Sequence, residues 1–274
     1  MCSITLKQSD DAIMRTLIRN TGTSGTGKNM PPYLTVFHVE KNCIKKEIFI
    51  MIRVNKKEYT DARKRIRSFI KKHNRLPNYC AFVTNEKKTV NLNKEEYCGL
   101  FEGYMQFCLK RGREPNYLTL NSKANNPIVV NYQDDKVSCC PASFLMAMMF
   151  LFEYKSEAEV KRALGTNKNG TTPSQLINGA KKLGYKVTII PREFKEVKKA
   201  LDNYSPVILQ IETKSAGNCL SYKNSYGHYI MCYKADSNKY YVMDPTKGPK
   251  VCNSTTLNKA TGGGNRKFYK VEMI

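Results

Sequence analysis

Two adjacent cysteines stand directly before the most apolar helix that the sequence predicts. The segment YQDDKVSCCPASFLMAMMFLF places Cys139 and Cys140 ahead of a run that is apolar on every side, so this helix must be central. A thiol at a helix N-terminus faces unpaired backbone N–H groups and the positive end of the helix dipole, and both favour the nucleophilic thiolate. The position therefore suits a catalytic cysteine.

A histidine and an aspartate lie further along the chain in two β-rich runs, GHYIMCYKA and KYYVMDP. Polar residues 236–238 between the runs predict a turn, so the runs should form an antiparallel hairpin. His228 and Asp244 are symmetric about residue 236, and a hairpin folded there brings them close together. The imidazole can then take the proton of a thiol and later protonate a leaving amine, while the carboxylate fixes its tautomer. Cys139, His228 and Asp244 are therefore the predicted catalytic residues of a thiol peptidase.

A glutamine precedes the cysteine pair, and its spacing helps to decide which of the two thiols is the nucleophile. Gln133 lies six residues before Cys139, and its side-chain amide can point toward a developing oxyanion together with the backbone N–H of that cysteine. This interval resembles the glutamine-to-cysteine spacing of papain-like enzymes, whose cysteine is often followed by Gly-Pro-Thr/Ala-Ser. Cys140 then occupies the usual glycine position, so the spacing favours Cys139 as the nucleophile.

Each of these residues also has a purely structural interpretation. The cysteines can be ordinary packing at a helix start, His228 a core histidine, and Asp244 the first residue of an Asp-Pro turn. Their joint occurrence, with agreement among the glutamine offset, the helix placement and the hairpin, favours the catalytic interpretation.

The elements around these residues predict an α+β domain over residues 126–274. Helical patterns at 157–164, 174–183 and 194–203 alternate with the strand-like runs YKVTII and SPVILQIE, and KFYKVEMI adds a strand at the C-terminus. A central helix packed on an antiparallel sheet is the arrangement of a papain-like cysteine peptidase domain, and this is the fold we expect.

The first half of the chain contains an internal duplication. Residues 55–82 return as residues 93–120 with the same opening, a helix-length middle and a Pro-Asn-Tyr close, and a looser copy covers residues 9–36. Each copy reads as a helix followed by a short strand, because proline disfavours helical geometry before it. Residues 1–125 are thus predicted to be a mainly helical domain of three repeats. The corresponding tyrosines are candidate substrate-binding residues, with helix termination and core packing as the alternative; they are Tyr33, Tyr79 and Tyr117.

The net charge of +23 is spread over both halves of the chain and indicates a polyanionic partner. Nucleic acid, anionic lipid and acidic polysaccharide all satisfy this electrostatic requirement. The repeats carry no signature of a known nucleic-acid-binding module, so nucleic acid is not the expected partner. The segment GTSGTGKN nearly matches the sequence motif of a phosphate-binding loop. However, Asn29 stands where that motif has the serine or threonine whose hydroxyl would hold magnesium.

The sequence shows neither a membrane span nor a signal peptide, because no apolar run approaches about 20 residues and the N-terminus lacks a basic start before an apolar stretch. The ten cysteines include no CxxC pair and no cluster with zinc spacing, so most are expected to be reduced and buried. We therefore expect synthesis in a reducing, intracellular compartment.

The repeats ending in LPNY and EPNYLTL resemble pseudomurein-binding repeats, and their combination with a C-terminal Cys-His-Asp domain is similar to the pseudomurein endoisopeptidases of methanogen viruses and proviruses. The motifs that carry this resemblance are NRLPNY, GREPNYLTL, YGHYIMCY and YYVMDPTKG. Two features depart from the family pattern, namely the degenerate first repeat and the Cys139–Cys140 doublet.

This resemblance implies hydrolysis of the isopeptide bond between alanine and the lysine side-chain amine in the cross-links of archaeal pseudomurein. That polymer carries uronic acid and glutamate carboxylates, which agrees with the positive charge of the chain. A family member of this kind is made in the host cytoplasm without a signal peptide and acts on the cell wall. It needs a reduced thiol and no cofactor. Divalent cations stimulate some members, but the sequence has no acidic ligand loop, so no metal is expected.

Two other functions remain open at the level of sequence. The first is a papain-like peptidase that acts on a protein or a double-glycine leader peptide. The second is a non-catalytic protein that binds a polyanion through its positive charge.

Overall fold

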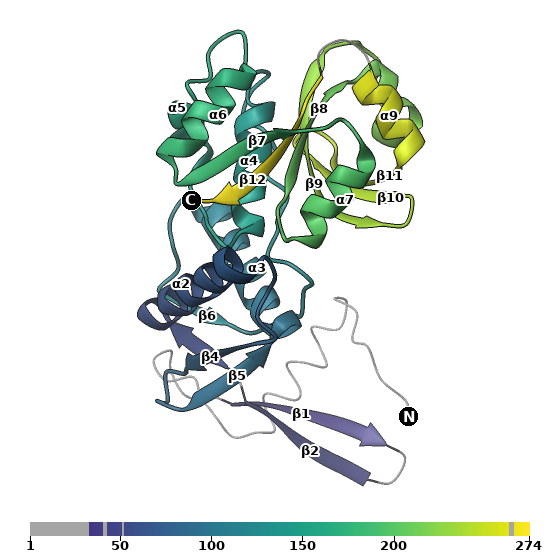
Figure 1. Ribbon diagram of the computed structural model, residues 1–274. Helices are drawn as coiled ribbons and strands as arrows, with labels where there is room; N and C mark the ends of the chain where they lie inside the picture. Colours follow the sequence, from purple (N-terminus) through teal and green to yellow (C-terminus); the bar gives the residue numbers. More distant parts are fainter. Residues whose placement is uncertain (1–32, 41–42, 51, 263–265) are drawn as a thin grey trace. The chain divides into compact units, whose positions relative to one another are not determined.

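The computed structural model describes residues 33–40, 43–50, 52–262 and 266–274, which belong to two compact units, residues 1–52 and residues 53–274 (Figure 1). In the first unit, β1 (Tyr33–Glu40) and β2 (Cys43–Ile50) pair as an antiparallel hairpin. The helix predicted near the start of the first copy and the segment GTSGTGKN lie outside the described residues. Tyr33 begins β1, and the structure describes its backbone alone.

The second and third copies have the same local structure. The second runs through β3 (Arg53–Asn55), α2 (Lys56–His73) and β4 (Tyr79–Val83), and the third runs through β5 (Thr89–Asn93), α3 (Lys94–Arg111) and β6 (Tyr117–Thr119). Asn55 and Asn93 cap the two helices by accepting a hydrogen bond from a backbone N–H of the first turn. The predicted order of helix and strand is therefore confirmed in both copies.

The strands of these two copies pair across the duplication rather than within each copy. β3 pairs with β6, which places Asn55 opposite Tyr117, and β4 pairs with β5, which places Tyr79 opposite Asn93. The strand before the helix of one copy thus pairs with the strand after the helix of the other copy. The two copies therefore form one reciprocal structure.

Two tyrosine hydrogen bonds follow the same reciprocal pattern. The Tyr59 hydroxyl donates to the Pro115 carbonyl (2.5 Å), and the corresponding Tyr97 hydroxyl donates to the Pro77 carbonyl (2.6 Å). Each Pro-Asn-Tyr segment is therefore held by a tyrosine from the helix of the other copy. A single copy would leave both the carbonyl and the strand edge without these partners.

Residues 53–120 pack directly on the rest of the second unit. The Arg67 guanidinium donates to the Leu151 carbonyl (2.8 Å) and the Tyr185 hydroxyl (2.9 Å), and it forms an ion pair with Glu153 (2.5 Å). The Phe152 ring meets rings of α3 and is fully buried. A division of function near residue 125 would therefore fall inside one compact unit.

The remaining strands form one antiparallel sheet with the order β11-β10-β9-β8-β12-β7 (Figure 1). The strands are β7 (Tyr185–Ile190), β8 (Val207–Glu212), β9 (Gly227–Asp236), β10 (Lys239–Asp244), β11 (Gly248–Asn253) and β12 (Phe268–Met273). The helices are α4 (Cys139–Phe150), α5 (Glu157–Leu164), α6 (Pro173–Lys182), α7 (Phe194–Asp202), α8 (Gly217–Leu220) and α9 (Ser254–Gly262). The α+β class and the helix packed on an antiparallel sheet agree with the prediction for this part of the chain.

Helices cover both faces of the middle strands. Val207, Leu209 and Ile211 of β8 belong to a buried apolar cluster that includes residues of α7 and α9. The alternate residue Ile208 is also fully buried, as expected for a strand covered on both faces. Helix α4 packs against β9, and the Ser143 hydroxyl donates to the Tyr229 carbonyl (2.9 Å). The start of α4 is thereby fixed near the start of β9.

No helix in the described part of the chain combines the length and the apolar character that crossing a membrane requires.

Candidate active site

The two cysteines of the doublet differ in exposure. Cys139 is the first residue of α4 and is partly exposed, whereas Cys140 is 0% exposed. Burial raises the pKa of the Cys140 thiol well above its usual range, with the nearby Cys139 thiol adding to that effect. A buried thiol with a raised pKa is neither accessible nor ionised at neutral pH, so the structure favours Cys139 as the reactive one.

The predicted hairpin is present, with its turn at the predicted polar residues and a bulge in β9. Asp236 pairs with Lys239, so the turn is centred one and a half residues beyond residue 236, and Tyr233 is an extra residue that has no partner on β10. Continuing the register after this bulge places Asp244 across from Ile230. His228 is therefore two residues from the position across from Asp244, and the two side chains still meet, as the sequence predicted.

The bulge nevertheless decides that the two side chains share a face. Residues two apart on a strand point to the same side, so His228 and Ile230 face the same way, and Asp244 faces the same way as the residue across from it. Without the extra residue Tyr233, Asp244 would lie across from Met231 and would point to the other side of the sheet. An irregularity in β9 is thus what brings the imidazole and the carboxylate together.

His228 and Asp244 form a buried pair. Their side chains are 2% and 0% exposed, and His228 Nε2 lies 3.1 Å from Asp244 Oδ1. Burial alone lowers the pKa of His228, but hydrogen bonds to Asp244 and to Cys139, together with the charges of both groups, raise it from 6.5 to about 9. Since Nε2 is bonded to the carboxylate, Nδ1 is the nitrogen left to face the thiol. The imidazole can therefore carry a proton at neutral pH.

The Asp244 carboxylate is surrounded by donors. Burial raises its pKa, but hydrogen bonding to His228, the charge of that imidazole and further donors lower it overall below its usual range. The backbone N–H groups of Thr246 and Lys247 donate to Oδ1 at 2.8 and 3.1 Å. Asp244 is thus both the turn former of the structural interpretation and the partner of His228, and the turn keeps its charge in place.

Tyr222 joins this pair and was not identified from the sequence. Its hydroxyl lies 2.8 Å from each carboxylate oxygen of Asp244 and 3.1 Å from His228 Nε2. The residue follows α8 in the segment SYKNSYGHY, which contains three tyrosines and no pattern that singles out one of them. Only the folded position of this segment reveals the contact.

Gln133 is held beside the turn that follows Asp244. Its backbone N–H donates to the Pro245 carbonyl (2.9 Å), and its side-chain oxygen accepts from the Thr246 hydroxyl (3.1 Å). The amide nitrogen donates to the Asp135 carbonyl (2.5 Å). One of the two amide hydrogens is therefore engaged, so the predicted role at an oxyanion would require the other.

The segment before Cys139 is anchored to α5. The buried Glu157 carboxylate accepts from the Asn131 side-chain amide (2.5 Å) and from the Asp134 backbone N–H (3.1 Å). Asp135 accepts from the hydroxyl of Ser138, the residue before Cys139 (2.6 Å), and pairs with Lys161. These contacts fix the path of the chain from Gln133 to the start of α4.

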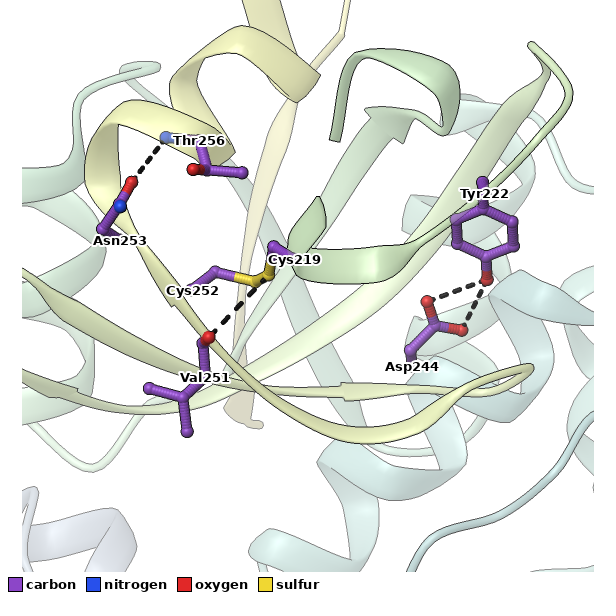
Figure 2. Close-up of a disulfide and its surroundings, with 7 residues drawn as sticks. All are labelled: Cys219, Tyr222, Asp244, Val251, Cys252, Asn253 and Thr256. Carbon is purple, nitrogen blue, oxygen red and sulfur yellow. Dashed lines mark hydrogen bonds between the residues drawn. A yellow bond between two sulfur atoms is a disulfide. The ribbon is translucent and has the colours of Figure 1, made fainter. Parts of the chain in front are cut away.

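One pair of cysteines forms a disulfide, an exception to the expectation that most cysteines are reduced. Cys219 of α8 is bonded to Cys252 of β11, with their Cα atoms 5.6 Å apart (Figure 2). The sequence does not predict this pair, because the two cysteines are 33 positions apart and only the fold brings α8 onto β11. Five other cysteines among the described residues are free and buried, as expected; they are Cys80, Cys98, Cys108, Cys140 and Cys232.

Within the described residues, no group of three or more histidine, cysteine or acidic side chains is arranged to hold a metal ion.

Residues 127–260 match the model of the Peptidase C39 family. This segment of the chain is therefore a Peptidase C39 family domain, and it contains Gln133, Cys139, Tyr222, His228 and Asp244. The family consists of cysteine peptidases with a papain-like fold, which is the class of domain that the sequence predicted. The match leaves residues 1–126 outside it.

Several solved structures are similar to about half of the chain. The peptidase domain of Streptococcus ComA, a bifunctional ABC transporter involved in a quorum sensing pathway, is 21% identical, with 52% of this chain and 97% of that chain covered and a TM-score of 0.42. A double glycine motif protease from an AMS/PCAT transporter, in complex with its leader peptide, is 16% identical, with coverages of 52% and 91% and a TM-score of 0.41. A C39-like peptidase from Bacillus anthracis is 14% identical, with coverages of 52% and 94% and a TM-score of 0.40. No curated protein matches the sequence.

Proposed function

We propose that the chain is a thiol endopeptidase in which Cys139 is the nucleophile, His228 the general acid and base, and Asp244 the residue that orients the imidazole. The observation that carries this proposal is the buried His228–Asp244 pair, whose imidazole bonds to the partly exposed thiol at the start of α4. A histidine with a pKa of about 9 retains a proton at neutral pH, and a neighbouring thiolate is its natural counter-charge.

The reaction follows from this arrangement. The Cys139 thiolate attacks the carbonyl carbon of the substrate, and the negative charge that develops on the carbonyl oxygen is stabilised by the backbone N–H of Cys139 and the free amide hydrogen of Gln133. His228 gives its proton to the leaving amine, which leaves a thioester on Cys139. His228 then takes a proton from water, which attacks the thioester and regenerates the thiol.

We infer that the substrate is the isopeptide bond between alanine and the lysine side-chain amine in pseudomurein, and that residues 1–125 bind this wall polymer. The resemblance of the repeats to pseudomurein-binding repeats supports this substrate. The net charge of +23 suits an acidic polymer. The reciprocal pair of copies also presents two corresponding tyrosines to solvent, since Tyr79 is 68% exposed and Tyr117 is 47% exposed.

The two exposed tyrosines should contribute to wall binding. In a Cys139→Ala background, which leaves the wall intact, Tyr79→Ala together with Tyr117→Ala should weaken binding to purified pseudomurein by roughly tenfold, because two aromatic contacts are lost. A pelleting assay with increasing wall concentration measures this, with Tyr241→Ala on the sheet as the matched control. Unchanged binding in the double variant would assign the tyrosines to packing alone.

The Peptidase C39 match favours a second candidate, the hydrolysis of a protein or of a double-glycine leader peptide. Purified pseudomurein and a set of such peptides should therefore be incubated with the protein in parallel, and newly exposed amines should be labelled and identified by mass spectrometry. The proposal expects lysine side-chain amines from the wall and no cleavage of the peptides. Cleavage of the peptides alone would establish the second candidate, and salt-sensitive polyanion binding without any hydrolysis would contradict both.

A further inference from the structure

The hydroxyl of Tyr222 lies between the two buried residues of the site. It is 2.8 Å from both oxygens of Asp244 and 3.1 Å from His228 Nε2, and its ring meets the imidazole with centroids 5.5 Å apart. The tyrosine thus contacts the imidazole and the carboxylate at once. Of these three residues, Tyr222 is the one for which neither the Cys-His-Asp pattern nor the proposed mechanism requires a role.

The donor and acceptor roles in this cluster follow from the protonation states. Burial raises the pKa of the Tyr222 hydroxyl far above its usual range, and the nearby Asp244 charge adds to the effect, so the hydroxyl keeps its proton. A neutral hydroxyl has one hydrogen, which it donates to the carboxylate, and its oxygen lone pairs are then available to the N–H at His228 Nε2. The imidazole consequently has two acceptors at Nε2, and a flip of the ring would lose both.

The segment that carries Tyr222 is tethered to the strand beside Asp244. The Cys219–Cys252 disulfide joins α8 to β11, and β11 pairs with β10, which ends at Asp244 (Figure 2). The Lys247 ammonium lies 5.3 Å from the centre of the Tyr222 ring, on the turn that follows β10. Covalent and non-covalent contacts thus hold the tyrosine against the same hairpin that it bonds to.

We propose that Tyr222 is a positioning residue whose hydroxyl fixes the Asp244 carboxylate and, through it, the imidazole of His228 that faces Cys139. The Cys219–Cys252 disulfide holds the segment from which the hydroxyl reaches the pair. This role rests on the proposed function only in requiring that Cys139, His228 and Asp244 act together, and it is independent of the substrate.

The groups that face Asp244 determine what removal of the hydroxyl does. They are His228 on β9, Tyr222 and Tyr226 on the segment after α8, the backbone N–H groups of Thr246 and Lys247 on the turn after β10, and Cys139 at the start of α4 through His228. The Tyr222 hydrogen bond is one of the interactions that lower the pKa of Asp244. Without it the pKa of Asp244 rises, so the carboxylate loses its charge at a higher pH, and the imidazolium loses the support of that charge there.

The test is the pH dependence of Cys139 alkylation in Tyr222→Phe, which keeps the ring and removes only the hydroxyl. The full chain is treated with iodoacetamide under non-reducing conditions, and the rate at Cys139 is read from the modified peptide by mass spectrometry between pH 3 and 10. We expect about a tenfold slower reaction at neutral pH, the usual effect of losing a hydrogen bond to a charged group. The pH at which the rate falls on the acid side of the profile should rise by about one pH unit.

Two comparisons make the result decisive. Tyr241→Phe, on the hairpin but away from the pair, should match the wild type, and Cys219→Ala with Cys252→Ala should shift the acid limb in the same direction as Tyr222→Phe, by less. A wild-type-like profile for Tyr222→Phe would overturn the positioning role and leave the proposed function intact. A wild-type Cys139 that reacts like an ordinary thiol over the whole range would contradict both. The melting temperature of Tyr222→Phe is measured first. If it falls well below that of the wild type, the double cysteine variant takes its place in the comparison. An unchanged profile in the double cysteine variant would contradict the role of the disulfide in holding Tyr222.

Discussion

Replacement of Cys139 by alanine should abolish hydrolysis while wall binding and the fold remain. Without the nucleophile no thioester can form, and losses on the order of 10⁴-fold or more are expected when a catalytic nucleophile is removed. The substitution deletes one sulfur from a partly exposed position at the start of α4, so the free energy of unfolding should change little. Released amines from purified walls measure the activity, and pelleting with intact walls measures the binding.

The neighbouring thiol provides the matched control. Cys140→Ala removes the same atom from a fully buried site one residue away, so it should lower the free energy of unfolding by about 1 kcal/mol and leave hydrolysis within a few-fold of the wild type. If Cys139→Ala kept full activity and Cys140→Ala lost it, the nucleophile would be Cys140. The assignment of Cys140 to the position that is usually glycine in related peptidases would then be wrong.

Replacement of His228 by alanine should have the second largest effect. The imidazole transfers a proton in both halves of the reaction, and general acid and base catalysis contributes roughly 10²- to 10⁴-fold to such reactions. Hydrolysis should fall by that factor even though Cys139 is still present. His73→Ala on α2, where the imidazole packs against the Phe69 ring with centroids 4.3 Å apart, is the control and should retain activity.

The same variant makes a prediction about stability that needs no substrate. The pKa of His228 is raised from 6.5 to about 9 in the folded protein, so its charge stabilises the fold fully below pH 6.5, and this contribution is lost as the pH rises through about 9. The difference in free energy of unfolding between the wild type and His228→Ala should therefore shrink between pH 6 and 10. A difference that stays constant over this range would mean that folding does not change the pKa of this imidazole.

The sequence predicted the site to the extent that local patterns determine it. A helix start carrying a cysteine, a hairpin carrying a histidine and an aspartate, and a glutamine at a fixed offset are all local features, and the structure has the helix, the hairpin and the contact between His228 and Asp244. The bulge at Tyr233 could not be predicted, because neither its type nor its neighbours distinguish it from the other residues of β9. This one residue determines which face Asp244 occupies.

Features that depend on long-range contacts could not be inferred from the sequence. The duplication predicted a helix and a strand in each copy. It could not predict the pairing of strands between the copies, because the corresponding strands of the two copies are similar and either pairing is compatible with the sequence. The Cys219–Cys252 bond and the contact of Tyr222 with Asp244 both require α8 to pack beside β11, and α8 has only four residues and no apolar periodicity. Such short elements are positioned by the surrounding fold rather than by their own sequence.

The central claim is that hydrolysis depends on the Cys139 thiol held by His228 and Asp244. The most direct test is a titration in which the protein is alkylated to increasing extents, and the fraction of modified Cys139 in each sample is compared with the remaining release of lysine side-chain amines from purified pseudomurein. The account predicts that activity falls in proportion to Cys139 modification and reaches zero when modification is complete, while the buried Cys140 remains unmodified. Activity that persists with fully modified Cys139 would contradict it.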